Sequence, residues 1–185
     1  MTTIHGIGNP WVMPDAPDDT TVREVVVIGA SGILAPLGAR LCRRGVRTVG
    51  VARGSLHGDE GFDEAVALDV HDVAAVLSWI GSRKVASDLV VAYGPAVGDA
   101  VWELWRGWAA RLLVVATSNW AAPSAPVPPW RMEEGVSVLQ LGWRADGAGW
   151  HSPTEVSEAV LRVVADGFPA HSVLGVVRPW EDHPR

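Results

Sequence analysis

The stretch that decides the fold is VVVIGASGILAPLGARLCRRG, from Val25 to Gly45. A run of β-branched residues passes through glycines into a helical pattern, with Gly29, Gly32 and Ala35 at the positions of a G-x-x-G-x-x-G/A turn. The first glycine of such a turn permits a sharp bend, the second lets backbone approach a pyrophosphate, and the third small residue lets helix pack on strand. The amides and dipole of the helix start favour an anion there. The stretch therefore predicts a dinucleotide site, the alternative being a glycine turn that serves packing alone.

The rest of the chain alternates short Val- and Leu-rich runs with helical patterns, as is typical of parallel strands buried on both faces. The predicted strands are the runs EVVVIGA, RTVGVA, EAVALDV, DLVVAYG, RLLVVATS, VSVLQLG and HSVLGVVRP, and the predicted helices cover about 34–44, 72–82, 96–109 and 154–166. This alternation predicts one doubly wound, Rossmann-type α/β domain over residues 22–185, with a mainly parallel sheet of about seven strands. Residues 1–21 carry no periodicity and are expected to form an irregular arm.

Composition excludes several classes of protein. Fifteen Lys and Arg face 21 Asp and Glu, which gives a net charge of −6 and argues against nucleic acid as the main partner. The single cysteine allows no internal disulfide, and the six histidines show no metal-ligand spacing. Neither a signal peptide nor an apolar run long enough to span a bilayer is recognisable, so a cytoplasmic protein without a membrane or metal site is expected.

Three further segments fall where a dinucleotide would need them. Arg53 and Ser55 follow the second predicted strand, where a guanidinium suits the 2′-phosphate of NADP; the alternative is a solvated arginine on a loop. Asp69 ends the third strand, where it could meet the adenine edge, and VAYGP ends the fourth, where small residues would let a ribose lie against backbone.

Taken together, GASGILA, VARGS, LDVHD, VAYGP and VVATS resemble the short-chain dehydrogenase/reductase family, from about Val22 to Pro179. The resemblance implies an NADP cofactor, a homodimer and a set of site residues. Carried over by position, Gly29, Ser31, Gly32 and Ile33 would hold the pyrophosphate, Arg53 and Ser55 the 2′-phosphate, Asp69 and Val70 the adenine, and Ala92, Tyr93 and Gly94 the ribose, while Ser118 would be the catalytic serine.

One departure from the family pattern bears directly on chemistry. Members of the family carry a Tyr-x-x-x-Lys pair after the serine, with Tyr as proton donor and Lys lowering its pKa. Here Trp130 and Glu134 hold that spacing, the only tyrosine is Tyr93, and the only lysine, Lys84, precedes the fourth strand. Tryptophan and glutamate cannot do this work, so the family's carbonyl-reduction machinery is absent. A Ser118–His151 pair is not favoured either, because Ser118 lacks a G-x-S-x-G elbow.

Six of the ten tryptophans fall into two groups. Trp102, Trp105 and Trp108 recur at helical spacing, which favours burial in the core or in a dimer contact. Beyond the fifth and sixth strands stand Trp120, Trp130 and Trp143, and the segment from Ala122 to Trp130 is too proline-rich for helix or strand. Segments there wall the ligand crevice of an open α/β sheet, so these three are candidates to bind a flat apolar substrate, packing being the alternative.

The function predicted is therefore that of an NADP(H)-binding, short-chain-dehydrogenase-like protein, an atypical oxidoreductase acting on a small apolar or aromatic molecule. Two alternatives stay open. One is a non-catalytic nucleotide-binding sensor or partner subunit, and the other is a cofactor-independent cyclase or isomerase on the same fold.

Overall fold

The computed structural model describes residues 22–56, 61–126, 128, 130, 134–146 and 149–180, so the predicted arm lies outside the described residues. The strands are β1 (Glu24–Ile28), β2 (Arg47–Ala52), β3 (Glu64–Ala67), β4 (Leu89–Tyr93), β5 (Leu112–Ala116), β6 (Val136–Leu141) and β7 (His171–Leu174). The α-helices are α1 (Ala35–Cys42), α2 (Val73–Ser82), α3 (Trp102–Trp108) and α4 (Pro153–Ala165). Short 3₁₀ turns are η2 (Gly94–Ala96), η3 (Asp99–Val101) and η4 (Ser118–Ala121).

The strands form one sheet in the order β3-β2-β1-β4-β5-β6-β7, and every neighbouring pair is parallel. The predicted seven-stranded, Rossmann-type sheet is confirmed. Chain order reverses between β1 and β4, which lie side by side although α1, β2, β3 and α2 separate them in sequence. In open α/β sheets ligands bind outside the carboxyl ends of the strands at such a reversal.

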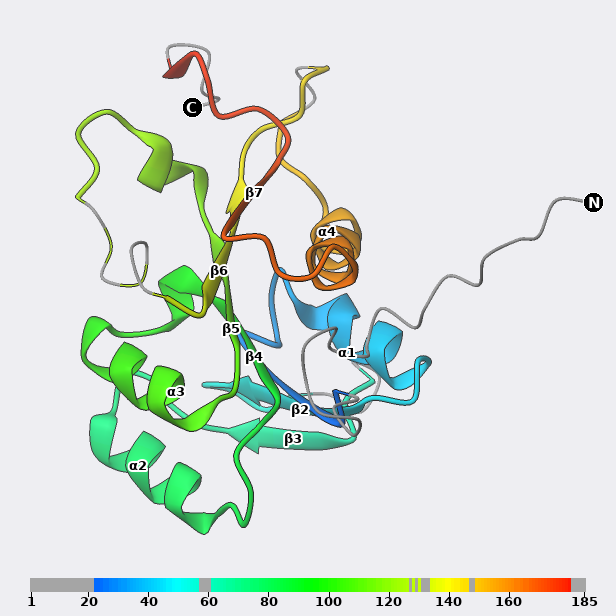
Figure 1. Cartoon of the computed structure of the whole chain (residues 1–185), viewed down its shortest axis with the longest axis vertical. Helices are drawn as coiled ribbons and strands as arrows, with labels where there is room; N and C mark the ends of the chain where they lie inside the picture. The colour runs from blue at the N-terminus through cyan, green and yellow to red at the C-terminus, as the bar shows by residue number, and fades with distance from the viewer. Residues whose placement is uncertain are drawn as a thin grey trace, which may run out of the picture.

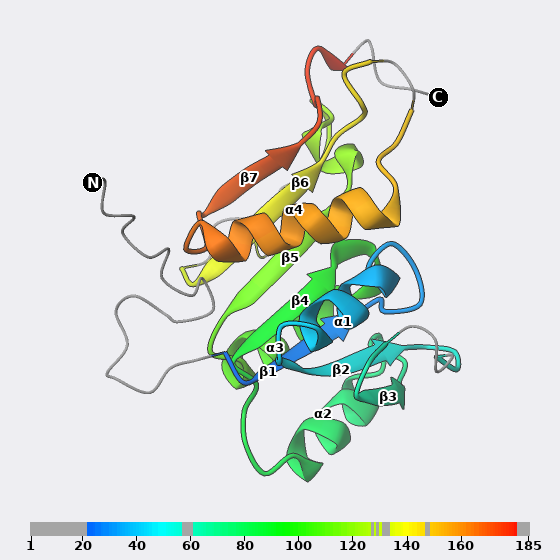
Figure 2. The same cartoon turned by 90° about the vertical axis from the view of Figure 1, so that its right-hand side faces the viewer.

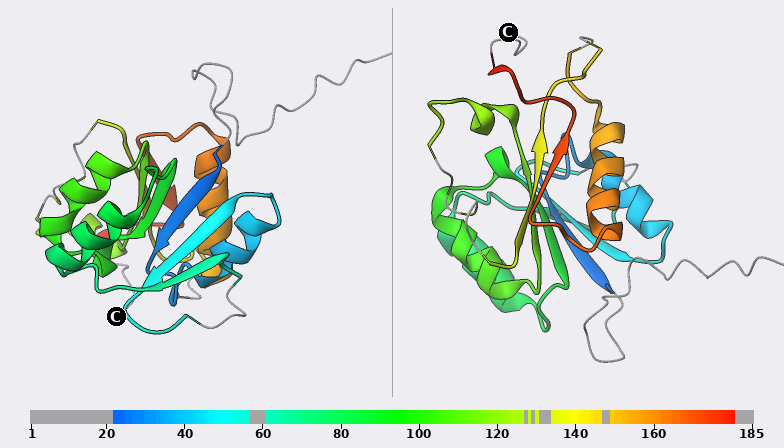
Figure 3. Two further views of the ribbon diagram at one scale, coloured as in Figure 1. Left: turned by 90° about the horizontal axis from the view of Figure 1, so that it is seen from below. Right: turned by 45° about the horizontal axis from the view of Figure 1, so that its top comes forward.

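Helices cover both faces of the sheet. Figures 1 and 3 show α1 and α4 against one face and α2 and α3 against the other, and Figure 2 looks onto the α1 and α4 face. The side chains of β1 alternate accordingly: Val25 and Val27 are buried under α1 and α4, while Val26 and Ile28 are buried in the opposite cluster. A strand buried on both faces is what the uninterrupted apolar run predicted.

The connection from β5 to β6 differs from the helical crossovers around it. In its described residues the only helical turns are 3₁₀, and the predicted irregular segment after Ala122 is observed wherever the structure describes it. Trp130 is 4% exposed and lies against Trp120 and Trp102, with ring centroids 4.5 and 6.0 Å apart. Indole rings thus cover the sheet beside β5 and β6 on the α2 and α3 face.

Candidate functional site

The turn between β1 and α1 has the geometry that its glycines predict. Gly29 has a φ of +87°, and a Cβ added to it would lie 3.0 Å from the Cβ of Tyr93. The fold itself therefore requires this glycine. At Gly32 an added Cβ would meet nothing closer than the carbonyl oxygen of Gly29, 3.8 Å away. Packing within the chain gives no reason for a glycine at this second position, whereas a ligand approaching the backbone would.

A groove of about 370 Å³ opens around this turn, between the ends of β1, β2 and β4. The structure brings seven of the predicted cofactor residues together in its lining: Gly29, Ser31, Gly32, Ile33, Arg53, Val70 and Tyr93. Arg53 is exposed and also lines the groove, and its role toward a phosphate stays a prediction. The lining also includes Val51, Ala52, Gly54, Leu68, Pro95 and Ala96, which the motif comparison did not single out.

The other four predicted cofactor residues do not line the groove. Ser55 is exposed, and Asp69 uses Oδ1 to accept a hydrogen bond from the backbone of His71, 3.0 Å away. Ala92 is fully buried within β4. The fold explains why residue 94 is a glycine without reference to a cofactor, since a Cβ there would clash with the Trp120 ring. Their roles toward a cofactor stay predictions.

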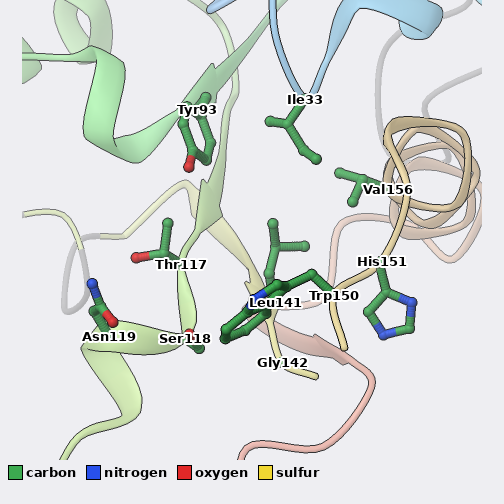
Figure 4. A pocket seen from close by; sticks show the side chains of 10 residues that line it. All are labelled: Ile33, Tyr93, Thr117, Ser118, Asn119, Leu141, Gly142, Trp150, His151 and Val156. Atoms are coloured by element: carbon green, nitrogen blue, oxygen red, sulfur yellow. The ribbon is translucent and has the colours of Figure 1, made fainter. Parts of the chain in front are cut away.

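A second cavity, of about 290 Å³, lies at the carboxyl ends of β4, β5 and β6 (Figure 4). One side is polar but uncharged, and the other side is mostly apolar. The polar residues are Tyr93, Thr117, Ser118 and Asn119, the apolar ones are Ile33, Leu141, Trp150 and Val156, and Gly142 and His151 complete the lining. Ser118, predicted as the catalytic serine, is buried in this wall at the start of η4.

The ends of the strands fix this wall. Thr117 and Ser118 follow β5 directly, and the side-chain amide of Gln140, on β6, donates a hydrogen bond to the Thr117 carbonyl. Because Gln140 is itself buried, this bond secures the backbone from which the two hydroxyl groups project. On the other side of the cavity, α4 contributes Val156.

The groove and the cavity share two lining residues, Ile33 and Tyr93. Tyr93 is half-buried at the end of β4, and its phenol lies on the polar side of the cavity with the hydroxyl directed toward Thr117 (Figure 4). Burial raises the pKa of this phenol above its usual value. No partner is found for its hydroxyl within the part of the chain that the structure describes, so the group is available to a ligand.

His151 also borders the cavity, but its ring nitrogens are enclosed. Both lack surface, and neither has a hydrogen-bond partner among the described residues. Nδ1 lies 3.7 Å from Glu155, and the Nε2 side packs against the backbone of Gly175. The ring therefore does not present a nitrogen to the cavity.

The tryptophans predicted to bind substrate occupy other places. Trp130 and Trp143 are 4% and 5% exposed, and Trp143 pairs its backbone with Trp150 and Val176. Trp120 packs on Trp130, and none of these three lines the cavity. Trp150 lines it instead, with 49% of its surface exposed. The sequence held no signal for Trp150, because an indole after β6 looks the same whether it faces inward or outward.

The family's catalytic pair has no counterpart in the described structure. Trp130 is buried, Glu134 is exposed, and neither of these two residues is itself in an α-helix. The described residues also contain no cluster of three potential metal ligands. Among the helices that the structure describes, none is long and apolar enough to cross a membrane.

Comparison with known proteins shows the fold. No protein-family model matches the sequence, and no curated protein matches it. A Serratia marcescens short-chain dehydrogenase/reductase, solved as a double mutant, superposes with a TM-score of 0.61 and 16% identity, covering 91% of this chain and 97% of that one. BdcA, solved in complex with NADPH, superposes with a TM-score of 0.60 and 16% identity, covering 83% of this chain and 93% of BdcA. A metagenomic short-chain oxidoreductase solved with NADP superposes with a TM-score of 0.55 and 15% identity, covering 83% of this chain and 96% of the oxidoreductase. The chain therefore has the Rossmann-type fold of the short-chain dehydrogenase/reductase structures, as its motifs predicted.

Proposed function

We propose that this protein is an NADP(H)-dependent oxidoreductase acting on a small, uncharged, apolar or aromatic substrate. The observation that carries the proposal is the junction of the groove and the cavity at Ile33 and Tyr93. A dinucleotide whose pyrophosphate lies on the glycine turn would extend toward the carboxyl ends of β4 and β5. Its nicotinamide end would then reach the cavity in which a substrate can bind.

NADP(H) is favoured over NAD(H) by the charge at the groove edge. Arg53 lines the groove, and neither aspartate nor glutamate is among the groove-lining residues. A guanidinium can donate charge-assisted hydrogen bonds to a 2′-phosphate, whereas NAD-specific domains place an acid on the ribose hydroxyls. BdcA and the metagenomic oxidoreductase, solved with NADPH and NADP, support the same choice.

The cavity lining supports the substrate class. None of its residues is an aspartate, glutamate, lysine or arginine, so a charged substrate would lose its hydration without gaining a partner. Three hydroxyl groups and the Asn119 amide can hydrogen-bond one carbonyl or hydroxyl oxygen. Leu141, Val156 and Trp150 would contact the apolar part, and Ser118 would orient the reacting oxygen.

Calorimetry followed by turnover tests this function. Titration with NADPH and with NADH is expected to show tighter binding of NADPH, and NADPH consumption is then measured with acetophenone and menadione. Absence of binding of either cofactor would overturn the proposal and favour cofactor-independent chemistry in the cavity.

A nucleotide-binding sensor or partner subunit is the second candidate. The β5–β6 connection favours it, because the described residues there form no α-helix to present a tyrosine and a lysine together. NADPH binding without consumption of any carbonyl, quinone or enone probe would select this candidate.

A further inference from the structure

Tyr93 is the one ionisable hydroxyl at the junction of the groove and the cavity, and the chain has no other tyrosine. Its backbone is fixed by pairing with Val115 of β5, and its Cβ lies close to Gly29 of the glycine turn. A rigid strand end therefore holds the phenol between the phosphate-binding turn and the Thr117 and Ser118 hydroxyls.

We propose that Tyr93 is the proton donor of this site, presented from the end of β4 where the family pattern would use a tyrosine after β5. The proposal rests on the function proposed above. It places the phenol beside the nicotinamide end of the cofactor and within reach of the substrate oxygen, which Ser118 and Asn119 on the same polar side of the cavity would also contact.

The step balances with water as the final proton source. As hydride from NADPH forms a C–H bond at the carbonyl carbon, the C=O π bond breaks and its electron pair takes the phenolic proton of Tyr93. The carbonyl is reduced to an alcohol, NADPH is oxidised to NADP⁺, and the tyrosinate regains a proton from water.

The other cavity groups fit this role less well. Serine and threonine hydroxyls and the Asn119 amide are far weaker acids than a phenol. Both ring nitrogens of His151 are buried by the surrounding residues, so the ring cannot contact a substrate through them without moving. The Tyr93 phenol is protonated at neutral pH and so has a proton to donate, although burial raises its pKa and makes it a weaker acid than an exposed tyrosine.

The single tyrosine permits a direct test that needs no substrate. Protein grown on 3-fluorotyrosine carries one fluorine label, at Tyr93, and the ¹⁹F shift reports ionisation of that phenol. The titration is run with NADPH and with NADP⁺ at saturation. The two ligands share their phosphates and differ by the positive charge of the oxidised ring, which stabilises a nearby tyrosinate. We expect a lower Tyr93 pKa with NADP⁺ than with NADPH. Adenosine 2′,5′-bisphosphate, which lacks nicotinamide, serves as the control for the adenine half.

The outcomes separate this proposal from the function on which it rests. If neither dinucleotide binds in calorimetry, the proposed function fails. If both bind and the Tyr93 pKa is the same with each, the function stands and the placement of Tyr93 at the nicotinamide is wrong.

Turnover then tests proton donation itself. Tyr93→Phe is expected to keep the NADPH Kd within about 2-fold and to lower kcat for acetophenone by about 10²–10⁴-fold, the usual contribution of general acid catalysis. The parent rate should fall as pH rises through the pKa of the phenol, and the variant should lose this dependence. Trp108→Phe, on α3 away from the cavity, controls for an aromatic change. Unchanged kcat in Tyr93→Phe, or no turnover by the parent with NADPH bound, would overturn the donor role.

Discussion

The β1–β2 connection and the β5–β6 connection both leave the carboxyl edge of the sheet, but they differ in structure. The first is a glycine turn leading into α1, whose open position at Gly32 leaves room for a ligand against the backbone. The second, in its described residues, is an irregular segment that covers the sheet with Trp120 and Trp130. The glycine-turn side therefore has the geometry that its motif predicts, while the β5–β6 side, in its described residues, is covered by packed indole rings. If the groove binds a dinucleotide as proposed, the proton donor must come from a part of the chain other than the β5–β6 connection.

Trp130→Ala is expected to have the largest effect on stability. The side chain is 4% exposed and contacts two other indoles, and deletion of such a ring typically costs about 3–5 kcal/mol of unfolding free energy. Urea-induced unfolding measures the change. Trp150→Ala is the control, because Trp150 is 49% exposed and its loss should cost clearly less than the loss of Trp130. A small stability loss for Trp130→Ala with weakened substrate binding would instead assign Trp130 to the substrate site.

Gly32→Val tests the opposite side of the comparison. An added Cβ there makes no close contact in the chain, so the thermal midpoint should stay nearly unchanged. The new side chain would occupy the space of the pyrophosphate, and we expect NADPH affinity to fall by about 100-fold, or about 2.8 kcal/mol. Calorimetry reads the affinity, and Gly107→Val, on α3, is the matched control. Equal NADPH affinity in Gly32→Val and the parent would show that the glycine turn does not bind the pyrophosphate.

Arg53→Ala should remove most of the preference for NADP(H). Loss of charge-assisted hydrogen bonds to the 2′-phosphate corresponds to about 2 kcal/mol, or roughly 30-fold in NADPH affinity, while NADH affinity should stay the same. Arg43→Ala removes an equal charge just after α1, outside the groove-lining residues, and should leave both affinities unchanged. An equal loss for both cofactors in Arg53→Ala would mean that Arg53 only supports the loop.

The same contrast marks what sequence could predict. The glycine turn and the buried strands are local features, since spacing and β-branched runs determine them within a few residues. The proline-rich stretch after Ala122 likewise excluded regular structure from composition alone. The cavity is not local, because its wall draws on β4, β5, β6 and α4, and only the folded sheet brings these segments together.

The direction in which a side chain points was the other feature that the sequence could not predict. Trp130 and Trp150 both stand beyond strand ends, yet one is buried in the core and the other lines the cavity. Nothing in their neighbours' identities distinguishes these outcomes, since both depend on tertiary packing. The need for glycine at position 94 could not be predicted either, because it comes from the Trp120 ring, 26 residues later in the chain.

The smallest predicted effect concerns the start of α4, which borders the cavity but not the groove. Ser152 and Glu155 form a capping box, in which Ser152 Oγ accepts from the Glu155 backbone and Glu155 accepts from the Ser152 backbone at 2.8 Å. Ser152→Ala should lower the unfolding free energy by about 1 kcal/mol at neutral pH, as loss of an N-cap does. The bonds from Ser152 lower the pKa of Glu155 below its usual value. The carboxylate's share of the cap is therefore full above the unfolded-state pKa and is lost as pH falls through the lower folded value. Urea unfolding of the parent and of Ser152→Ala across that range should show the gap narrowing in acid, with Ser78→Ala on α2 as control. NADPH affinity should be the same in all three proteins, and a loss of affinity in Ser152→Ala would show that α4 supports the groove as well as the cavity.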